Sequence, residues 1–236
     1  MEMKREKGLF YVLGAGVLWG ATLGLYGRFM SALGFTAMQT TAVRMLVSAL
    51  VFLFYGLFAN KSIFKIALRD CWMFIGSGIV SIAAFCYFYF TSLAYAPLAV
   101  VSILLYTSPV FIMLFSALLF KERITRSKLV AMILALCGCM LVSGLMEGFG
   151  TVPLYGVVTG LLAGLTYSLY SIFARYALKK YGTLTINLYT FVFATLATLP
   201  AGGAVKTLSM LTASAQPLAV GLIGSLLCSA APFFLY

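Results

Sequence analysis

An apolar stretch that occurs twice constrains the fold of this chain more than any other sequence feature. Residues 75–88, IGSGIVSIAAFCYF, return as residues 223–236, IGSLLCSAAPFFLY, with six identities in fourteen positions at an offset of 148. Gly34 and Gly182 keep the same offset, and a further set of matches at an offset of 144 joins the start of the chain to residues 155–170. The order of the matches is kept, so we interpret the chain as two copies of one unit.

The copies are built from long apolar runs joined by short polar connections. The chain is 63% hydrophobic and 9% charged, with a mean hydropathy of +1.08, whereas a soluble domain carries roughly 25% charged residues. Each run is close to the roughly 20 residues that a bilayer span requires. The sequence therefore predicts an all-α, polytopic membrane protein with about eight transmembrane helices, near residues 8–30, 35–59, 71–95, 98–120, 128–145, 154–178, 184–200 and 217–236.

The positions of lysine and arginine predict the orientation. Thirteen of the 16 lie at the N-terminus (3) or near the connections between the second and third (3), fourth and fifth (4), and sixth and seventh (3) predicted helices. Basic connections stay in the cytoplasm, so we expect the N-terminus to be cytoplasmic. The plasma (inner) membrane is the expected location. This distribution accounts for the net charge of +11, and we expect the lipid bilayer and a small-molecule substrate as partners rather than nucleic acid.

The number of helices in the first copy gives the repeat its symmetry. We assign residues 1–146, with helices 1–5, to the first repeat and residues 147–236, with helices 6–8, to the second. Five is odd, so the second copy runs inverted, and inverted repeats with a substrate path near their interface are a secondary-transporter design. Adding the offset of 148 to the end of the first copy also leads us to expect that these 236 residues are a fragment lacking two further spans.

Several short motifs, in order along the whole chain, resemble the EamA family of the drug/metabolite transporter superfamily. They are Leu18-Trp19-Gly20, Arg44, Tyr95-Ala96-Pro97, Ser108-Pro109-Val110-Phe111, Lys121-Glu122-Arg123-Ile124-Thr125 and the run LTYSLYSIFARY. The resemblance implies a five-plus-five inverted repeat that exports small metabolites, often amino acids, by alternating access. The chain departs from this pattern at its C-terminal end, where the counterparts of the last helices are missing.

Polar and aromatic side chains deep in the predicted spans are the candidates for a substrate pathway. A buried hydroxyl or indole N–H needs a partner, and several such residues together suit an amphipathic or aromatic substrate, although packing is the alternative role for each. Arg44 lies some nine residues into its helix, where a charge costs about 2.5–3.5 kcal/mol, so it should face the protein interior or a wet cavity; snorkelling to the interface is the alternative. In a cavity it could attract a carboxylate. The candidates are Trp19, Tyr26, Arg44, Tyr87, Tyr89, Tyr106, Ser108, Tyr167 and Tyr170.

Glycines and prolines in the spans are candidates for helix packing or kinks. Small residues four apart let helix backbones approach closely, and Pro109 frees a backbone carbonyl one turn earlier, near Leu105. Broken helices line cavities at transport sites, and a simple kink is equally compatible with the sequence. The candidates are Gly16, Gly20, Gly24, Pro97, Pro109, Gly156, Gly160 and Gly164.

The residues that are absent argue against several classes of function. The chain has no histidine, and Cys137 and Cys139 point in different directions on a helix, so we expect no metal, no cofactor and no enzymatic activity. Efflux of cationic drugs is an alternative, but it usually calls for a buried carboxylate, and none lies in the apolar runs. A membrane protein without transport activity is a further alternative, against which the inverted repeat weighs. The oligomeric state is left open by the sequence.

The predicted orientation can be tested with single cysteines at Ser62, Ser127 and Gly150 in a cysteine-free background. A membrane-impermeant thiol reagent applied to intact cells should label the cysteine at position 150 and leave the other two unlabelled until the cells are permeabilised, because basic connections face the cytoplasm. Strong labelling at position 62 with none at position 150 would reverse the topology.

Overall fold

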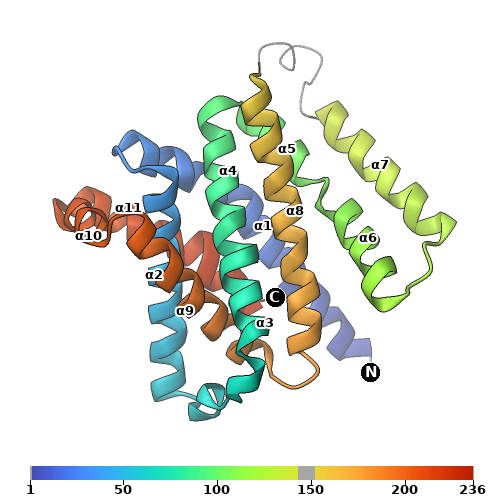
Figure 1. Cartoon of the computed structure of the whole chain (residues 1–236), viewed down its shortest axis with the longest axis horizontal. Coiled ribbons are helices and arrows are strands. Elements are labelled where there is room, and N and C mark those ends of the chain that lie inside the picture. The colour runs from blue at the N-terminus through green and yellow to red at the C-terminus, as the bar shows by residue number, and fades with distance from the viewer. Residues whose placement is uncertain (1, 143–151, 236) are drawn as a thin grey trace. The chain divides into compact units, whose positions relative to one another are not determined.

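The structure, a computed structural model, describes residues 2–142 and 152–235, and most of these residues are helical with no strand among them (Figure 1). The assigned end of the first repeat, after residue 146, lies outside the described residues, as does the rest of the connection over 143–151. The elements are α1 (Glu2–Ala32), α2 (Ala37–Phe58), η1 (Lys61–Phe64), η2 (Leu68–Asp70), α3 (Cys71–Ile75), η3 (Gly76–Ala83), α4 (Ala84–Tyr95), α5 (Leu98–Leu105), α6 (Ser108–Phe120), α7 (Arg126–Val142), α8 (Leu154–Ala177), α9 (Thr183–Ala201), α10 (Ala204–Thr212), α11 (Ala215–Ser225), η5 (Leu226–Ala230) and α12 (Ala231–Leu235).

Within the described residues, seven stretches are long and apolar enough to cross a membrane. They are Phe10–Ala32, Ala37–Phe58, Leu68–Tyr95, Leu98–Phe120, Leu154–Ala177, Thr183–Ala201 and Ala215–Leu235. The prediction of an all-α, polytopic membrane protein is confirmed. The remaining predicted span, 128–145, corresponds to α7, of which 17 residues are described.

One predicted connection is wrong in its local structure. The sequence leaves residues 201–216 as a polar connection between the last two predicted spans, whereas the structure forms α10 there. Thr207 and Leu211, four residues apart, are its buried positions, so a single face of this short helix packs inward. With nine residues the helix is too short to span a bilayer, so a search for apolar runs of span length does not find it.

The helices form two compact units, residues 1–69 with 181–236 and residues 70–180. We call them unit 1 and unit 2. Unit 1 combines α1 and α2 with α9–α12, and unit 2 combines α3–α7 with α8. Each unit therefore mixes helices from both predicted repeats, and the repeat boundaries of 1–146 and 147–236 stay a prediction.

In unit 1, α2 packs along α9, and α1 packs against α11, η5 and α12. The ring of Phe52 on α2 is fully buried and stacks on Phe191, at 5.6 Å between centroids, and on Phe234, at 4.3 Å. The start of α2 is closed by a capping box, in which Thr36 Oγ1 accepts from the Gln39 backbone N–H and the Gln39 side chain accepts from the Thr36 N–H. This box satisfies two helix-end donors within the chain.

In unit 2, α8 is the helix on which η3, α4, α5 and α6 pack, and Figure 1 shows α4 and α8 running side by side. Small residues permit this approach. A Cβ built on Gly160 would lie 3.0 Å from the Cβ of Leu104, and one on Gly164 would lie 2.7 Å from Thr107 Oγ1 and 3.0 Å from the Leu104 carbonyl oxygen. Gly156 is also buried, and a Cβ built on it would lie 3.1 Å from the Cβ of Tyr95.

The corresponding glycines of α1 differ in their surroundings. Gly16 and Gly20 are exposed in the described structure, and within unit 1 no described atom comes within 4 Å of a Cβ built on either one. Gly24 is buried. A packing role for Gly16 and Gly20 stays a prediction.

Replacing Gly164 with alanine should destabilise unit 2, because the new methyl group meets a backbone carbonyl that cannot move without shifting α5. Overpacking of this kind costs about 1–3 kcal/mol. Gly138→Ala is the matched control, since it adds the same methyl group to a helix of unit 2 at a position where no described atom comes within 4 Å of the new Cβ. Thermal unfolding of the purified variants in detergent checks this, and equal midpoints for the two variants would contradict close packing at Gly164.

Candidate functional site

Two π-helical segments occur at matching positions in the repeated stretches. These segments are η3, Gly76–Ala83, and η5, Leu226–Ala230. Residues 78–82 of η3 align with all of η5 at the offset of 148. π-Helical turns are rare and are often found at functional sites. The repeated sequence therefore encodes a repeated distortion of the backbone.

Buried hydroxyl groups tie each π segment to the helix beside it. In unit 2, Ser81 Oγ of η3 donates to the Thr166 carbonyl oxygen of α8 at 2.9 Å. In unit 1, Ser225 Oγ, directly before η5, donates to Tyr26 Oη of α1 at 3.3 Å, and Tyr26 Oη donates to the Thr40 carbonyl oxygen at 3.3 Å. In unit 2 the π segment itself is bonded to the first helix of the other predicted repeat, and in unit 1 the bond comes from the residue directly before the π segment.

A glycine under an aromatic ring accompanies each π segment. A Cβ built on Gly76 would overlap the ring of Phe173, and one built on Gly224 would overlap the ring of Tyr26. The two glycines are 148 residues apart and belong to the repeated IGS sequence. The close approach of ring and backbone is thus a shared feature of both units.

Arg44 faces the interior of unit 1. Its side chain is only 2% exposed, and Nη2 donates to the Cys228 carbonyl oxygen of η5 at 3.2 Å. Pro232 lies four residues after Cys228 and has no N–H for an α-helical bond to that carbonyl, so Arg44 donates to an acceptor that the helix itself does not pair in this way. A snorkelling arginine would extend its guanidinium group to the membrane surface, whereas the Arg44 side chain is buried inside unit 1.

This contact is not duplicated in the repeat. At the offset of 148, Val192 corresponds to Arg44, and Ala84 corresponds to Pro232. The arginine and the proline therefore depart from their counterparts together, one in each predicted repeat. Asn187 of α9 makes a related contact, because its Nδ2 donates to the Phe233 carbonyl oxygen at 2.8 Å.

The candidate aromatic residues of unit 2 fall into two environments. Tyr89 and Tyr167 both pack on Phe85, with centroid distances of 5.6 and 5.1 Å. Tyr87 is half-buried beside Phe88, at 5.5 Å. The structure therefore brings Tyr89 and Tyr167 together and leaves Tyr87 on a different side of α4.

Tyr106 and Ser108 lie at an interruption of the fourth predicted span. α5 ends at Leu105 and α6 begins at Ser108, with Tyr106 52% exposed and Ser108 buried. Thr107 Oγ1 donates to the Leu104 carbonyl oxygen at 2.6 Å, which helps to satisfy the backbone at the break. The interruption begins after Leu105, close to the carbonyl that Pro109 is expected to free. Its role in lining a pathway stays a prediction.

The other candidates take structural contacts within their own units. Trp19 packs edge to face on Phe233, at 5.2 Å between centroids, and Tyr170 of α8 is buried. Pro97 immediately precedes α5 as its N-cap residue. A role in substrate binding stays a prediction for all nine pathway candidates.

Paired charges lie at the ends of the unit 2 spans. Arg175 Nη1 lies 2.6 Å from Glu122 Oε1, and the Arg175 guanidinium lies 4.0 Å over the Phe120 ring. The hydrogen bond and charge of Arg175 hold the pKa of Glu122 below its usual range. Lys180 Nζ lies 2.7 Å from Asp70 Oδ1, whose carboxylate is buried. In the part of the chain that the structure describes, no cluster of histidine, cysteine or acidic residues could hold a metal ion.

The sequence analysis missed the serines as site residues although their signal was present. Ser77, Ser81, Ser225 and Ser229 are all buried and recur in pairs at the offset of 148. A small hydroxyl that is kept in both copies of an apolar stretch indicates a polar contact inside the fold. Ser81 donates to Thr166 and Ser225 donates to Tyr26, partners that lie 85 and 199 residues away in the chain, and no local pattern predicts them. Ser77 instead donates to the Phe74 carbonyl oxygen, three residues earlier.

We expect Arg44→Met to lower the free energy of unfolding by about 1–3 kcal/mol, because it leaves the Cys228 carbonyl without a charged donor. Pro232→Ala restores an N–H four residues after Cys228 and should recover part of this loss in the Arg44→Met background. A double-mutant cycle, followed by unfolding in detergent, measures the coupling. Strictly additive effects of the two substitutions would show that they do not act on the same carbonyl.

Comparison with known proteins places these features in a family. Residues 6–144 match the profile of a protein family described as the EamA-like transporter family. One solved crystal structure covers 98% of this chain with a TM-score of 0.72 at 24% identity, over 77% of its own chain, which shows a shared fold.

Curated relatives share parts of the sequence. The pseudopaline exporter CntI of Pseudomonas aeruginosa is 34% identical over 49% of this chain and 39% of its own length. The aromatic amino acid exporter YddG of Ancylobacter novellus is 32% identical over 46% of this chain and 39% of its own length. An uncharacterized transporter of Archaeoglobus fulgidus is 22% identical over 73% of this chain and 58% of its own length. The matches thus span between about two fifths and three fifths of the length of these relatives.

Proposed function

This chain belongs to the EamA-like transporter family, and on that premise we propose that it takes part in exporting a small metabolite, an amino acid or a related compound, from the cytoplasm by alternating access. The observation that carries the proposal is the family match over residues 6–144. The relatives named as exporters of pseudopaline and of aromatic amino acids support the substrate class.

The repeated π segments support a mechanism of alternating access. Inverted-repeat transporters move one half against the other around a site formed by distorted helices. Here a serine in or directly before each π segment bonds the helix beside it, Ser81 of η3 to Thr166 in unit 2 and Ser225 before η5 to Tyr26 in unit 1. We propose that the irregular backbone around these contacts lines the substrate path, and that the N-terminus faces the cytoplasm.

The aromatic candidates fit the proposed substrate class. Trp19 and Tyr87 are half-buried, and Tyr106 is exposed within its unit at the break between α5 and α6. Rings that are not sealed in the core can contact an apolar or aromatic substrate side chain, while their polar atoms bond its charged groups. Tyr89, Tyr167 and Tyr170 serve the packing of unit 2 in the same proposal.

Efflux of cationic drugs is less well supported by the charges. The acidic residues of unit 2 that the structure describes, Asp70 and Glu122, lie at span ends and are paired with Lys180 and Arg175. A cation carrier needs a carboxylate that can exchange its partner for the substrate, because a buried charge without a partner is costly. The described spans place no such carboxylate near mid-membrane.

Efflux from cells that express the gene tests the proposed function. Cells preloaded with a pool of labelled amino acids should lose one or a few of them faster than cells without the gene, while ethidium retention should be unchanged. Trp19→Ala, Tyr87→Ala and Tyr106→Ala should each slow this efflux about tenfold, which corresponds to about 1.4 kcal/mol of lost interaction.

The matched control for these variants is Phe58→Ala, which removes an aromatic ring that is 86% exposed. It should leave efflux within about twofold of the parent when the amounts in the membrane are equal, a margin of less than 1 kcal/mol. Ethidium efflux without amino acid efflux would favour the drug transporter instead. Equal loss in Phe58→Ala and in the three pathway variants would remove the case for a specific aromatic site.

A further inference from the structure

A cavity of about 450 Å³ lies between α6 and α7 in unit 2. Figure 1 shows these two helices beside each other, joined by the short connection over residues 121–125. The walls come from one stripe of each helix with helical spacing, which includes Ile112, Met113 and Ser116 of α6 and Ala131, Met132 and Ala135 of α7. Residues spaced by three and four lie on one helix face. The cavity therefore lies between two largely apolar helix faces.

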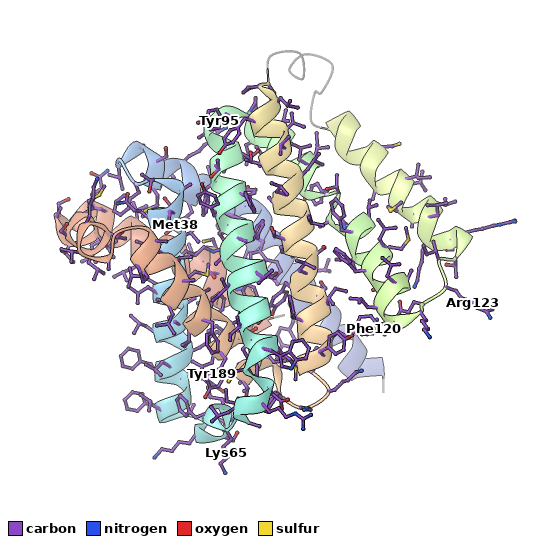
Figure 2. All side chains as sticks on the ribbon, viewed as in Figure 1. Met38, Lys65, Tyr95, Phe120, Arg123 and Tyr189 are labelled. Atoms are coloured by element: carbon purple, nitrogen blue, oxygen red, sulfur yellow. The ribbon has the colours of Figure 1, made fainter. Side chains whose placement is uncertain are left out.

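One end of this cavity is charged. Arg123 and Lys128 take part in its lining together with the carboxylate of Glu122. Glu122 is bound to Arg175 at 2.6 Å and lies 3.7 Å from Lys128, and the hydrogen bond from Arg175 keeps its pKa low, so its charge is already matched. Arg123 lies on the connection between α6 and α7 (Figure 2), and no described acidic residue forms an ion pair with it.

The turn that presents these charges is built into the end of α6. Lys121 adopts a left-handed conformation, with φ of 53°, and its backbone N–H bonds the Ser116 carbonyl. This conformation terminates α6 and places Glu122 against Arg175 of α8. The turn and the Glu122–Arg175 ion pair therefore fix the connection that carries Arg123.

We propose that this cavity binds an anionic phospholipid, with an acyl chain between α6 and α7 and the phosphate against Arg123 and Lys128. A guanidinium group is planar and binds phosphate oxygens in pairs, and a basic pocket between transmembrane helices is suited to an anionic headgroup. The apolar side chains of α6 and α7 that line the cavity can pack against an acyl chain. The proposal goes beyond export, and it uses the proposed orientation only to assign the site to the cytoplasmic leaflet.

The shape of the lining favours a lipid over other anions. A free phosphate would use only the charged end and leave both apolar stripes facing empty space, whereas a lipid covers the charged and the apolar parts together. Ser116 is the polar residue among the wall residues named above, and its carbonyl oxygen already accepts a hydrogen bond from the Lys121 backbone N–H. Charge at one end and apolar surface along two helices are the properties of a phospholipid.

Native mass spectrometry of the purified chain in detergent tests this proposal. Phosphatidylglycerol and phosphatidylcholine with the same acyl chains are titrated separately, and we expect phosphatidylglycerol to bind at least about tenfold more tightly. Arg123→Gln should reduce this preference about tenfold. Lys121→Asn is the matched control, since it removes one basic charge from the same connection at a left-handed position that asparagine tolerates and that does not line the cavity.

A second pair of variants tests the apolar part. Ala131→Phe fills the cavity from α7 and Ser116→Met fills it from α6, and either should weaken phosphatidylglycerol binding without a change of charge. Thermal unfolding identifies a variant that has lost its fold, and the other variant then decides the result. Retained binding in a folded, filled variant would overturn the proposal.

The remaining outcomes separate other occupants from a lipid. Equal binding of the two lipids, or an equal loss in Lys121→Asn and Arg123→Gln, would mean that charge acts without a site. Displacement of phosphatidylglycerol by glycerol 3-phosphate or inorganic phosphate at similar concentrations would mean that the site recognises a free anion. A dimeric mass with no bound lipid would mean that a second copy covers this face. A preference for phosphatidylglycerol that is lost in Arg123→Gln and kept in Lys121→Asn supports the proposed site, whether or not the protein exports amino acids.

Discussion

The backbone of a membrane-spanning chain must satisfy its own hydrogen bonds, because the hydrocarbon core offers no water to do so. Straight helices meet this constraint within one segment, but this chain departs from them at η3, at η5 and between α5 and α6. A side-chain hydrogen bond lies at each departure. At η3, Ser81 donates to the Thr166 carbonyl of α8. Arg44 donates to the Cys228 carbonyl, and Thr107 donates to the Leu104 carbonyl. The donor comes from the packed helix α2 at η5 and from the break itself between α5 and α6.

The same constraint explains how the two units are assembled. A π segment is stabilised by a neighbouring helix, and in each unit that neighbour is the first helix of the other predicted repeat, α8 for η3 and α1 for η5. The glycines at 76 and 224 allow an aromatic ring to lie against the distorted backbone in both units. Neither unit consists of one predicted repeat alone.

Charge serves a different purpose from the buried polar groups. Glu122, Arg175 and Lys128 lie at the ends of α6, α8 and α7, where exposed ion pairs contribute little to stability. Their value is geometric, because they hold the connection over residues 121–125 against α8. Hydroxyl groups inside the spans make short-range hydrogen bonds to specific acceptors, such as the bond from Ser81 to the Thr166 carbonyl.

The sequence by itself determined the helical class, seven of the spans, the family and the place where the fourth span breaks, because these follow from local apolar length, basic connections and the covalent restriction imposed by Pro109. It also displayed the paired serines, whose recurrence at an offset of 148 was visible before their contacts were known. Only the tertiary structure decided that α10 forms between spans, that Gly160 and Gly164 meet α5 closely, and that the acceptor of Arg44 lies 184 residues away at Cys228. The reason is physical: propensity and hydropathy act over a few turns of one helix, whereas the partner of a buried donor depends on which helices pack together.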